Sequence, residues 1–66
     1  MNVRIDRIKL VAEMTRQDLT QKELAEKAGV SKATVCYIKG GKSCSDDVGK
    51  KIAAALGVKL STLLER

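Results

Sequence analysis

Apolar residues recur every three or four positions along most of this chain, a spacing that places them on one face of a helix. The first such run predicts a helix that begins between Asn2 and Asp6 and ends near Gln17. Asp18 and Leu19 would then form the connection to the next helix. We expect the buried face of the first helix, with Leu10 alongside, to consist of Ile5, Ile8, Val11, Ala12 and Met14.

A second helix is expected to begin at Thr20, because Thr20 and Glu23 have the spacing of a capping box. Gly29 would end this helix, since glycine adopts the left-handed conformation at no steric cost. Val30 follows as a buried residue. The inner face of the helix is predicted to be Leu24, Ala25 and Ala28.

A third helix is expected to follow at once, with Ser31 as its N-cap and the pair Gly40-Gly41 at its end. Val35 and Ile38 lie three positions apart and would face inward. The opposite side of this helix would then carry Lys32, Ala33, Cys36 and Tyr37.

The remaining pattern predicts a fourth helix from about Ser43–Ser45 to Gly57 and a short fifth helix from about Leu60 to Glu65. Val3–Asp6 alternates like a strand, but four residues are weak evidence, and a short N-terminal arm is the alternative. With 66 residues and no proline, repeat or linker, residues 1–66 are expected to form one all-α domain of five helices without a sheet. The buried residues of the last two helices would be Val48, Ile52, Ala55, Leu56, Leu60, Leu63 and Leu64.

The break between the second and third helices predicts a helix-turn-helix, in which two short helices meet at a steep angle across a few residues that include glycine. The exposed start of the third helix would then project far enough to enter the major groove of DNA. Ala25 is small enough for the two helices to cross closely above it.

The charge of the chain supports a polyanionic partner, because Lys and Arg outnumber Asp and Glu by 13 to 8 and give a net charge of +5. No acidic residue occurs from Ser31 to Ser45, so that segment can approach phosphates without repulsion. The chain has one Tyr and no Phe or Trp, which removes the stacking platforms of single-strand and RNA binders. Double-stranded DNA is therefore the expected ligand.

Other functions find little support in the sequence. No apolar run is long enough for a membrane span, and the N-terminus lacks a signal-peptide core, which favours a cytoplasmic protein. With no His and only two Cys, we expect no metal, and we expect no cofactor. The segment Gly40–Ser43 ends like a P-loop but lacks its earlier glycine and a preceding strand, so we expect no enzyme.

The stretch LTQKELAEKAGVSKATV, together with the later IAAALGVKLSTLLE, resembles the Cro/CI (XRE-type, lambda-repressor-like) family of bacterial and phage regulators. The resemblance covers nearly the whole chain and implies a five-helix lambda-repressor-like fold whose second and third helices form the helix-turn-helix. The chain departs from the family pattern at Lys39, where an acid is common, and at Gly49, where a bulky apolar residue is usual.

The resemblance also implies a role for individual residues. At the exposed start of the third helix and one turn later, the candidates for base contacts are Lys32, Ala33, Cys36 and Tyr37. Tyr37 packed against a neighbouring helix and a half-buried, structural Cys36 are the alternatives. The candidates for phosphate contacts are Gln21, Ser31, Thr34, Lys39, Lys42 and Ser43, with Ser31 also a cap.

These expectations together describe a sequence-specific regulator of transcription that acts as a repressor and inserts its third helix into the major groove. A symmetric homodimer would read two half-sites about 34 Å apart, with the leucines of the last helix as its contact, unless those leucines complete the core instead. We expect no domain for a small-molecule effector. The alternative function is an antitoxin or a protein-interaction adaptor built on the same fold.

Overall fold

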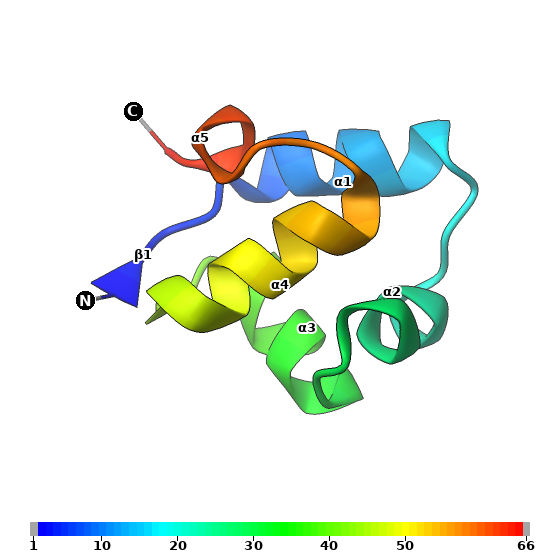
Figure 1. Ribbon diagram of the computed structural model, residues 1–66, viewed down its shortest axis with the longest axis horizontal. Coiled ribbons are helices and arrows are strands. Elements are labelled where there is room, and N and C mark those ends of the chain that lie inside the picture. The colour runs from blue at the N-terminus through cyan, green and yellow to red at the C-terminus, as the bar shows by residue number, and fades with distance from the viewer. Residues whose placement is uncertain (1, 66) are drawn as a thin grey trace.

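The computed structural model describes residues 2–65, and within them the chain forms five helices and one small sheet. In Figure 1, α1 and α5 lie along one side of the molecule, α2 and α3 lie on the opposite side, and α4 crosses in front. The predicted all-α fold with five helices is confirmed. The elements in chain order are β1 (Asn2–Val3), α1 (Arg7–Arg16), α2 (Gln21–Ala28), α3 (Lys32–Lys39), β2 (Cys44–Ser45), α4 (Asp46–Leu56) and α5 (Leu60–Leu63).

The expectation of no sheet is wrong, because β1 and β2 pair in antiparallel fashion, with Asn2 opposite Ser45 and Val3 opposite Cys44. The arm then continues along the other end of the chain, where Ile5 and Leu64 form an isolated bridge. This pairing is flanked by two hydrogen bonds, one from the Asp6 N–H to the Leu63 carbonyl (2.7 Å) and one from the Glu65 N–H to the Arg4 carbonyl (3.0 Å). Strands of two residues that pair across about forty positions of the sequence leave no periodic pattern of apolar residues.

The first helix begins later than its apolar pattern indicates, which changes its buried face. Asp6 is the N-cap and accepts hydrogen bonds from the Ile8 and Lys9 N–H groups. Ile5 is buried but lies before the helix in the bridge to Leu64, so its position does not set the helical phase. The face predicted for this helix is therefore wrong in three positions, since Ile8 is 73% exposed, Val11 is 40% exposed and Ala12 is exposed. The residues of α1 that enter the core are Leu10 and Met14.

The corner between α2 and α3 forms as predicted. Thr20 and Glu23 make the capping box, and the Thr20 N–H, which donates to the Glu23 carboxylate, lowers the pKa of that carboxyl group. Gly29 has φ 73° and ψ 30°, the left-handed conformation, and the Val30 N–H donates to the Ala25 carbonyl at 3.0 Å. Ala25 is buried below this turn, and Val30, which was predicted to be buried, is half-buried against the core.

Helix α4 is the central element of the core, and its N-cap is Ser45, whose Oγ accepts from the Val48 N–H at 3.2 Å. Its glycine, Gly49, faces two other elements closely. A Cβ atom at this position would lie 3.1 Å from Leu60 Cδ1 and 3.1 Å from Val3 Cγ2. The close approach of β1 and α5 therefore explains why Gly49 replaces a bulky residue.

The leucines of the last helix complete the core. Leu63 is fully buried, and Leu60 packs against the core beside Gly49. Helix α5 ends at Leu63, before the predicted end at Glu65, because Leu64 turns away to pair with Ile5. Leu60 and Leu63 thus have the alternative role considered for them, and the prediction that they form a dimer contact is wrong for the buried Leu63.

We expect Gly29→Val to lower the free energy of unfolding by about 1–3 kcal/mol, because a β-branched residue resists a positive φ. No atom lies within 4 Å of the position of an added Cβ, so the loss would report backbone strain and not a clash. Thermal unfolding followed by circular dichroism measures the effect. Gly29→Asn is the matched control and should lose much less, because Asn tolerates this conformation. Equal melting temperatures for Gly29→Val and the parent chain would contradict the assigned role of the turn.

Candidate nucleic-acid interface

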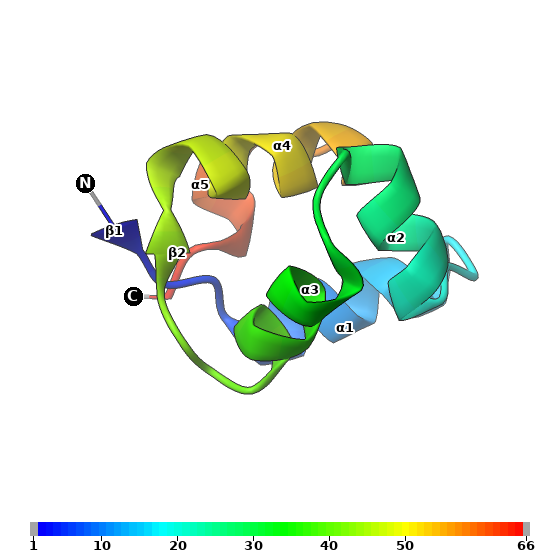
Figure 2. The same cartoon turned by 90° about the horizontal axis from the view of Figure 1, so that it is seen from below.

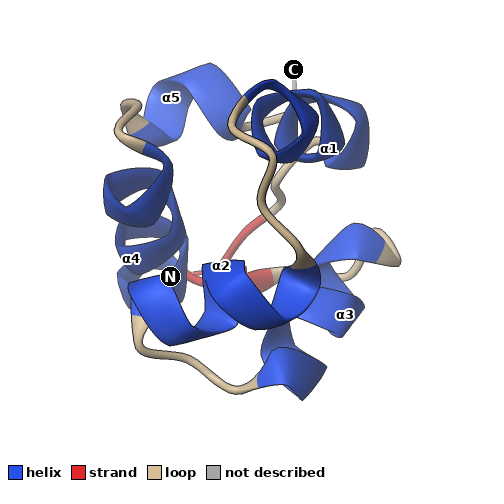
Figure 3. Ribbon diagram, turned by 90° about the vertical axis from the view of Figure 1, so that its right-hand side faces the viewer, coloured by secondary structure: helices blue, strands red, loops and turns tan. Residues whose placement is uncertain are grey.

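The outer face of α3 brings together the four residues predicted to contact bases. Val35 and Ile38 point into the core and are fully buried, so the opposite side of the same helix faces solvent. Helices α2 and α3 lie side by side in Figure 2 and in Figure 3, and in Figure 3 α1 lies above them. The exposed residues of α3 are Lys32, Ala33, Cys36 and Tyr37, and we call them the α3 outer face.

The residues predicted to contact phosphates surround this face but differ in their availability. Ser31 caps α3, because its Oγ accepts from the Thr34 N–H at 3.1 Å. The same Oγ lies 2.8 Å from Thr34 Oγ1, so these two hydroxyl groups bond to each other in the free protein. Gln21, the first residue of α2, is half-buried. The rest follow along the end of α3 and the next loop: Lys39 is half-buried, and Lys42 and Ser43 are exposed.

The loop after α3 turns back over the helix that precedes it. Gly41 has φ 91°, and the Lys42 N–H donates to the Tyr37 carbonyl at 3.1 Å. This turn places the Lys42 ammonium 5.1 Å from the centroid of the Tyr37 ring. Tyr37 is 58% exposed, so more than half of its surface faces solvent and not a neighbouring helix.

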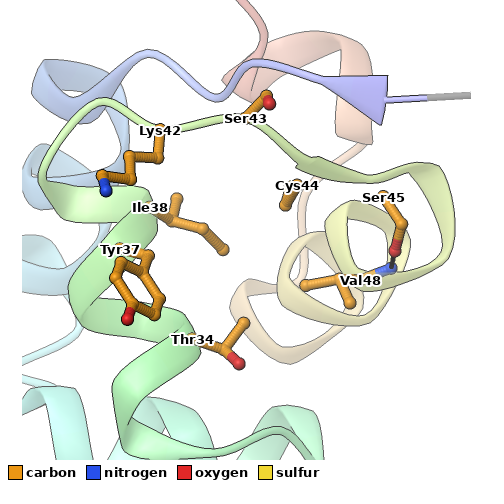
Figure 4. Close-up of a pocket in the computed structure, with 8 residues that line it drawn as sticks. All are labelled: Thr34, Tyr37, Ile38, Lys42, Ser43, Cys44, Ser45 and Val48. Atoms are coloured by element: carbon orange, nitrogen blue, oxygen red, sulfur yellow. Dashed lines mark hydrogen bonds between the residues drawn. The ribbon is translucent and has the colours of Figure 1, made fainter.

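A hollow of about 410 Å³ lies between α3 and the start of α4, next to the α3 outer face. Figure 4 shows Tyr37 and Lys42 on the α3 side of this hollow, Val48 on the opposite side and Cys44 between them. Burial raises the pKa of the Cys44 thiol. Cys36, by contrast, is exposed, so the alternative of a half-buried, structural Cys36 is wrong.

Basic residues with acidic partners and basic residues without them lie in different parts of the molecule. Within residues 2–65, every ion pair lies outside α2, α3 and their loops: Arg4–Glu65, Arg16–Glu13, Lys50–Asp46 and Lys51–Asp47. In the segment 20–43 the acids are Glu23, which closes the capping box, and Glu26 on α2. The lysines of this segment, none of which has an ion-pair partner among the described residues, are Lys22, Lys27, Lys32, Lys39 and Lys42.

Sequence reasoning missed one residue at this interface, Arg4. Its Nη2 donates to the Gly41 carbonyl at 2.9 Å, and its Nε lies 3.4 Å from Glu65 Oε2. Arg4 thereby joins the loop after α3 to the other end of the chain. No sequence signal marks this contact, because the two partners lie 37 positions apart.

Residues 2–65 contain neither a candidate membrane span nor a candidate metal site. No helix there is both long and apolar enough to cross a membrane. Within the same residues, no group of three or more Cys, Asp or Glu side chains is arranged to hold a metal ion.

Comparison with known proteins yields one family and one similar structure. A helix-turn-helix family model, of the Cro/CI-like XRE type, matches residues 8–63. A chain from the structure of a mutant hydroxyethylphosphonate dioxygenase superposes with a TM-score of 0.85 at 27% identity. That match covers 96% of the present chain but only 14% of the dioxygenase chain. No curated protein matches the sequence.

We expect Cys36 to react with a thiol reagent several-fold faster than Cys44 at pH 8. Cys36 is exposed, whereas burial raises the pKa of Cys44 and leaves less of the reactive thiolate at that pH. The rates can be measured by absorbance on the single variants Cys44→Ser and Cys36→Ser, each of which retains one thiol. In guanidinium chloride the two rates should converge. A difference that persists in the unfolded chains would contradict burial as its cause.

Proposed function

The chain belongs to the helix-turn-helix family of Cro/CI-like, XRE-type proteins, and we propose that it is a sequence-specific regulator of transcription that inserts α3 into the major groove of double-stranded DNA. The observation that carries this proposal is the α3 outer face. It is exposed, it contains no acid, and it is bordered by lysines without acidic partners among residues 2–65. Such a surface can release counterions from DNA without first breaking ion pairs of its own.

The individual roles follow from position on this face. Lys32 lies in the first turn of α3 and can donate to guanine O6 and N7, and the methyl group of Ala33 fits the methyl group of thymine. Cys36 lies one turn later and supplies an apolar contact. Gln21, Ser31, Thr34, Lys39, Lys42 and Ser43 are assigned to phosphates, with Ser31 and Thr34 exchanging their mutual hydrogen bond for DNA oxygens.

The finer parts of the proposal concern assembly and regulation. We place the protein in the cytoplasm as a repressor that covers its operator as a homodimer, because two copies of α3 about 34 Å apart would read two half-sites. The contact between subunits would not include Leu63, which is buried within the chain. We assign no catalytic activity, cofactor or metal to this chain.

A second function is favoured by one finding. The similar structure is part of a dioxygenase, so the fold also occurs as a small part of an enzyme chain. We therefore keep the adaptor or antitoxin, in which the same fold contacts a protein, as the second function. The lysines around α3, which have no acidic partner among residues 2–65, favour DNA over this alternative, because an adaptor has no need of an acid-free surface.

A salt series on random duplex DNA separates the two functions. A DNA-binding protein should lose affinity steeply as the salt concentration rises, with a slope of about −0.9 per phosphate contact in a plot of log K against log salt concentration. Fluorescence anisotropy of a labelled duplex gives K at each salt concentration. The absence of binding at low salt would refute the proposed function and favour the adaptor.

We expect Lys32→Ala to reduce discrimination between the selected site and random duplex by about 1–3 kcal/mol. The selected site is obtained by enrichment from a random duplex library, whose palindromy also tests the homodimer. Lys59→Ala removes the same charge at the start of α5, outside the proposed interface, and should leave discrimination unchanged. Equal losses of affinity on both DNAs for Lys32→Ala would rule out a base contact by this residue.

A further inference from the structure

The Lys42 side chain is held in place before any ligand arrives. Its ammonium lies 5.1 Å from the centre of the Tyr37 ring, within the range of a cation–π contact. The backbone of Lys42 is also held by Tyr37, since the Lys42 N–H donates to the Tyr37 carbonyl at 3.1 Å. Lysine loses much side-chain freedom when it is ordered, so a lysine that is already restrained binds an anion at a lower entropic cost.

The turn that presents Lys42 would be loose without further contacts, because it contains two consecutive glycines. Gly40 and Gly41 close the end of α3, and the Gly41 N–H donates to the Ile38 carbonyl at 3.0 Å. On the other side of the turn, Arg4 donates to the Gly41 carbonyl. The backbone of Arg4 is itself anchored, because its carbonyl accepts from the Glu65 N–H.

We propose that Tyr37 and Arg4 are positioning residues, which hold the Lys42 ammonium at the end of α3 in readiness for a DNA phosphate. This inference rests on the DNA-binding function proposed above and assigns the Tyr37 ring a use different from reading a base. The ring restrains Lys42 directly, and Arg4 acts on it through the Gly41 turn. Lys42 and not Arg4 would neutralise the phosphate, because the guanidinium of Arg4 is already shared between Gly41 and Glu65.

The contact can be tested first in the free protein. Protons held over an aromatic face resonate upfield, and Tyr37 is the single aromatic residue of the chain. We expect the side-chain methylene protons of Lys42 to lie upfield of those of the other lysines in the NMR spectrum. Tyr37→Phe should preserve this shift, and Tyr37→Leu should abolish it. Lys42 protons that coincide with those of the other lysines would overturn the inference without touching the proposed function.

The consequence for binding is tested with the same two variants. Tyr37→Phe should bind the selected site and random duplex more tightly than Tyr37→Leu does, because it retains the ring. Tyr37→Leu should weaken both about two- to five-fold, the effect of losing an exposed cation–π contact, and should have no further effect in a Lys42→Ala background. A loss of discrimination in Tyr37→Phe would mean that the hydroxyl group contacts a base, and would overturn the positioning role.

The salt dependence of binding separates positioning from direct contact for Arg4. Lys42→Ala should make the salt slope shallower by about 0.9, the value for one phosphate. Arg4→Ala should weaken binding about two- to five-fold with the slope unchanged, the range expected for an exposed polar contact. Thermal unfolding of each variant confirms that it is folded under the conditions of the titration. A slope that falls by about 0.9 in Arg4→Ala would mean that Arg4 contacts a phosphate itself, and would overturn its positioning role.

Discussion

The left-handed turn at Gly29 is the constraint on which the arrangement of the interface depends. At this turn the Val30 N–H donates to the Ala25 carbonyl, and α3 begins three residues after Gly29, at Lys32. The angle between the two helices is therefore set by residues that are neighbours in the sequence. That angle directs Val35 and Ile38 into the core. Once these two side chains are buried, the helical period requires the opposite side of α3 to face solvent. The exposure of Lys32 and its neighbours is thus a consequence of packing.

A second constraint acts through the ends of the chain. The arm that carries Val3, Arg4 and Ile5 contacts α4, the segment that follows α5 and the loop after α3. Gly49 permits this arrangement, because a larger side chain there would collide with both Val3 and Leu60. The arm therefore links the element that follows α3 to the core. A change at either end of the chain can in this way affect the position of Lys42.

A segment similar to the present chain is also a small part of a dioxygenase chain, and a fold by itself does not fix an activity. The features that give proteins of this fold different functions must therefore lie on the surface. In the present chain the ion pairs gather on α1, α4 and the chain ends, whereas the lysines of the helix-turn-helix have no acidic partner among residues 2–65. This separation of paired from unpaired charge is a property of the surface that the fold alone does not require.

The sequence by itself determined the features that depend on neighbours within about four positions. These are the capping box at Thr20, the stops at Gly29 and Gly57, the cap at Ser31, and the division of α3 into a buried and an exposed side. From them the five helices and the members of the α3 outer face could be predicted.

Only the tertiary structure decided the features that depend on distant partners. The bridge of Ile5 to Leu64 removed Ile5 from α1 and so turned Ile8 and Val11 to solvent, which the apolar spacing alone could not reveal. The same pairing of the chain ends buried Leu63 and brought Arg4 to the Gly41 turn. The spacing of apolar residues predicts which side of a helix is buried, because it depends only on residues a few positions apart. Contacts between residues tens of positions apart form only when the whole chain has packed.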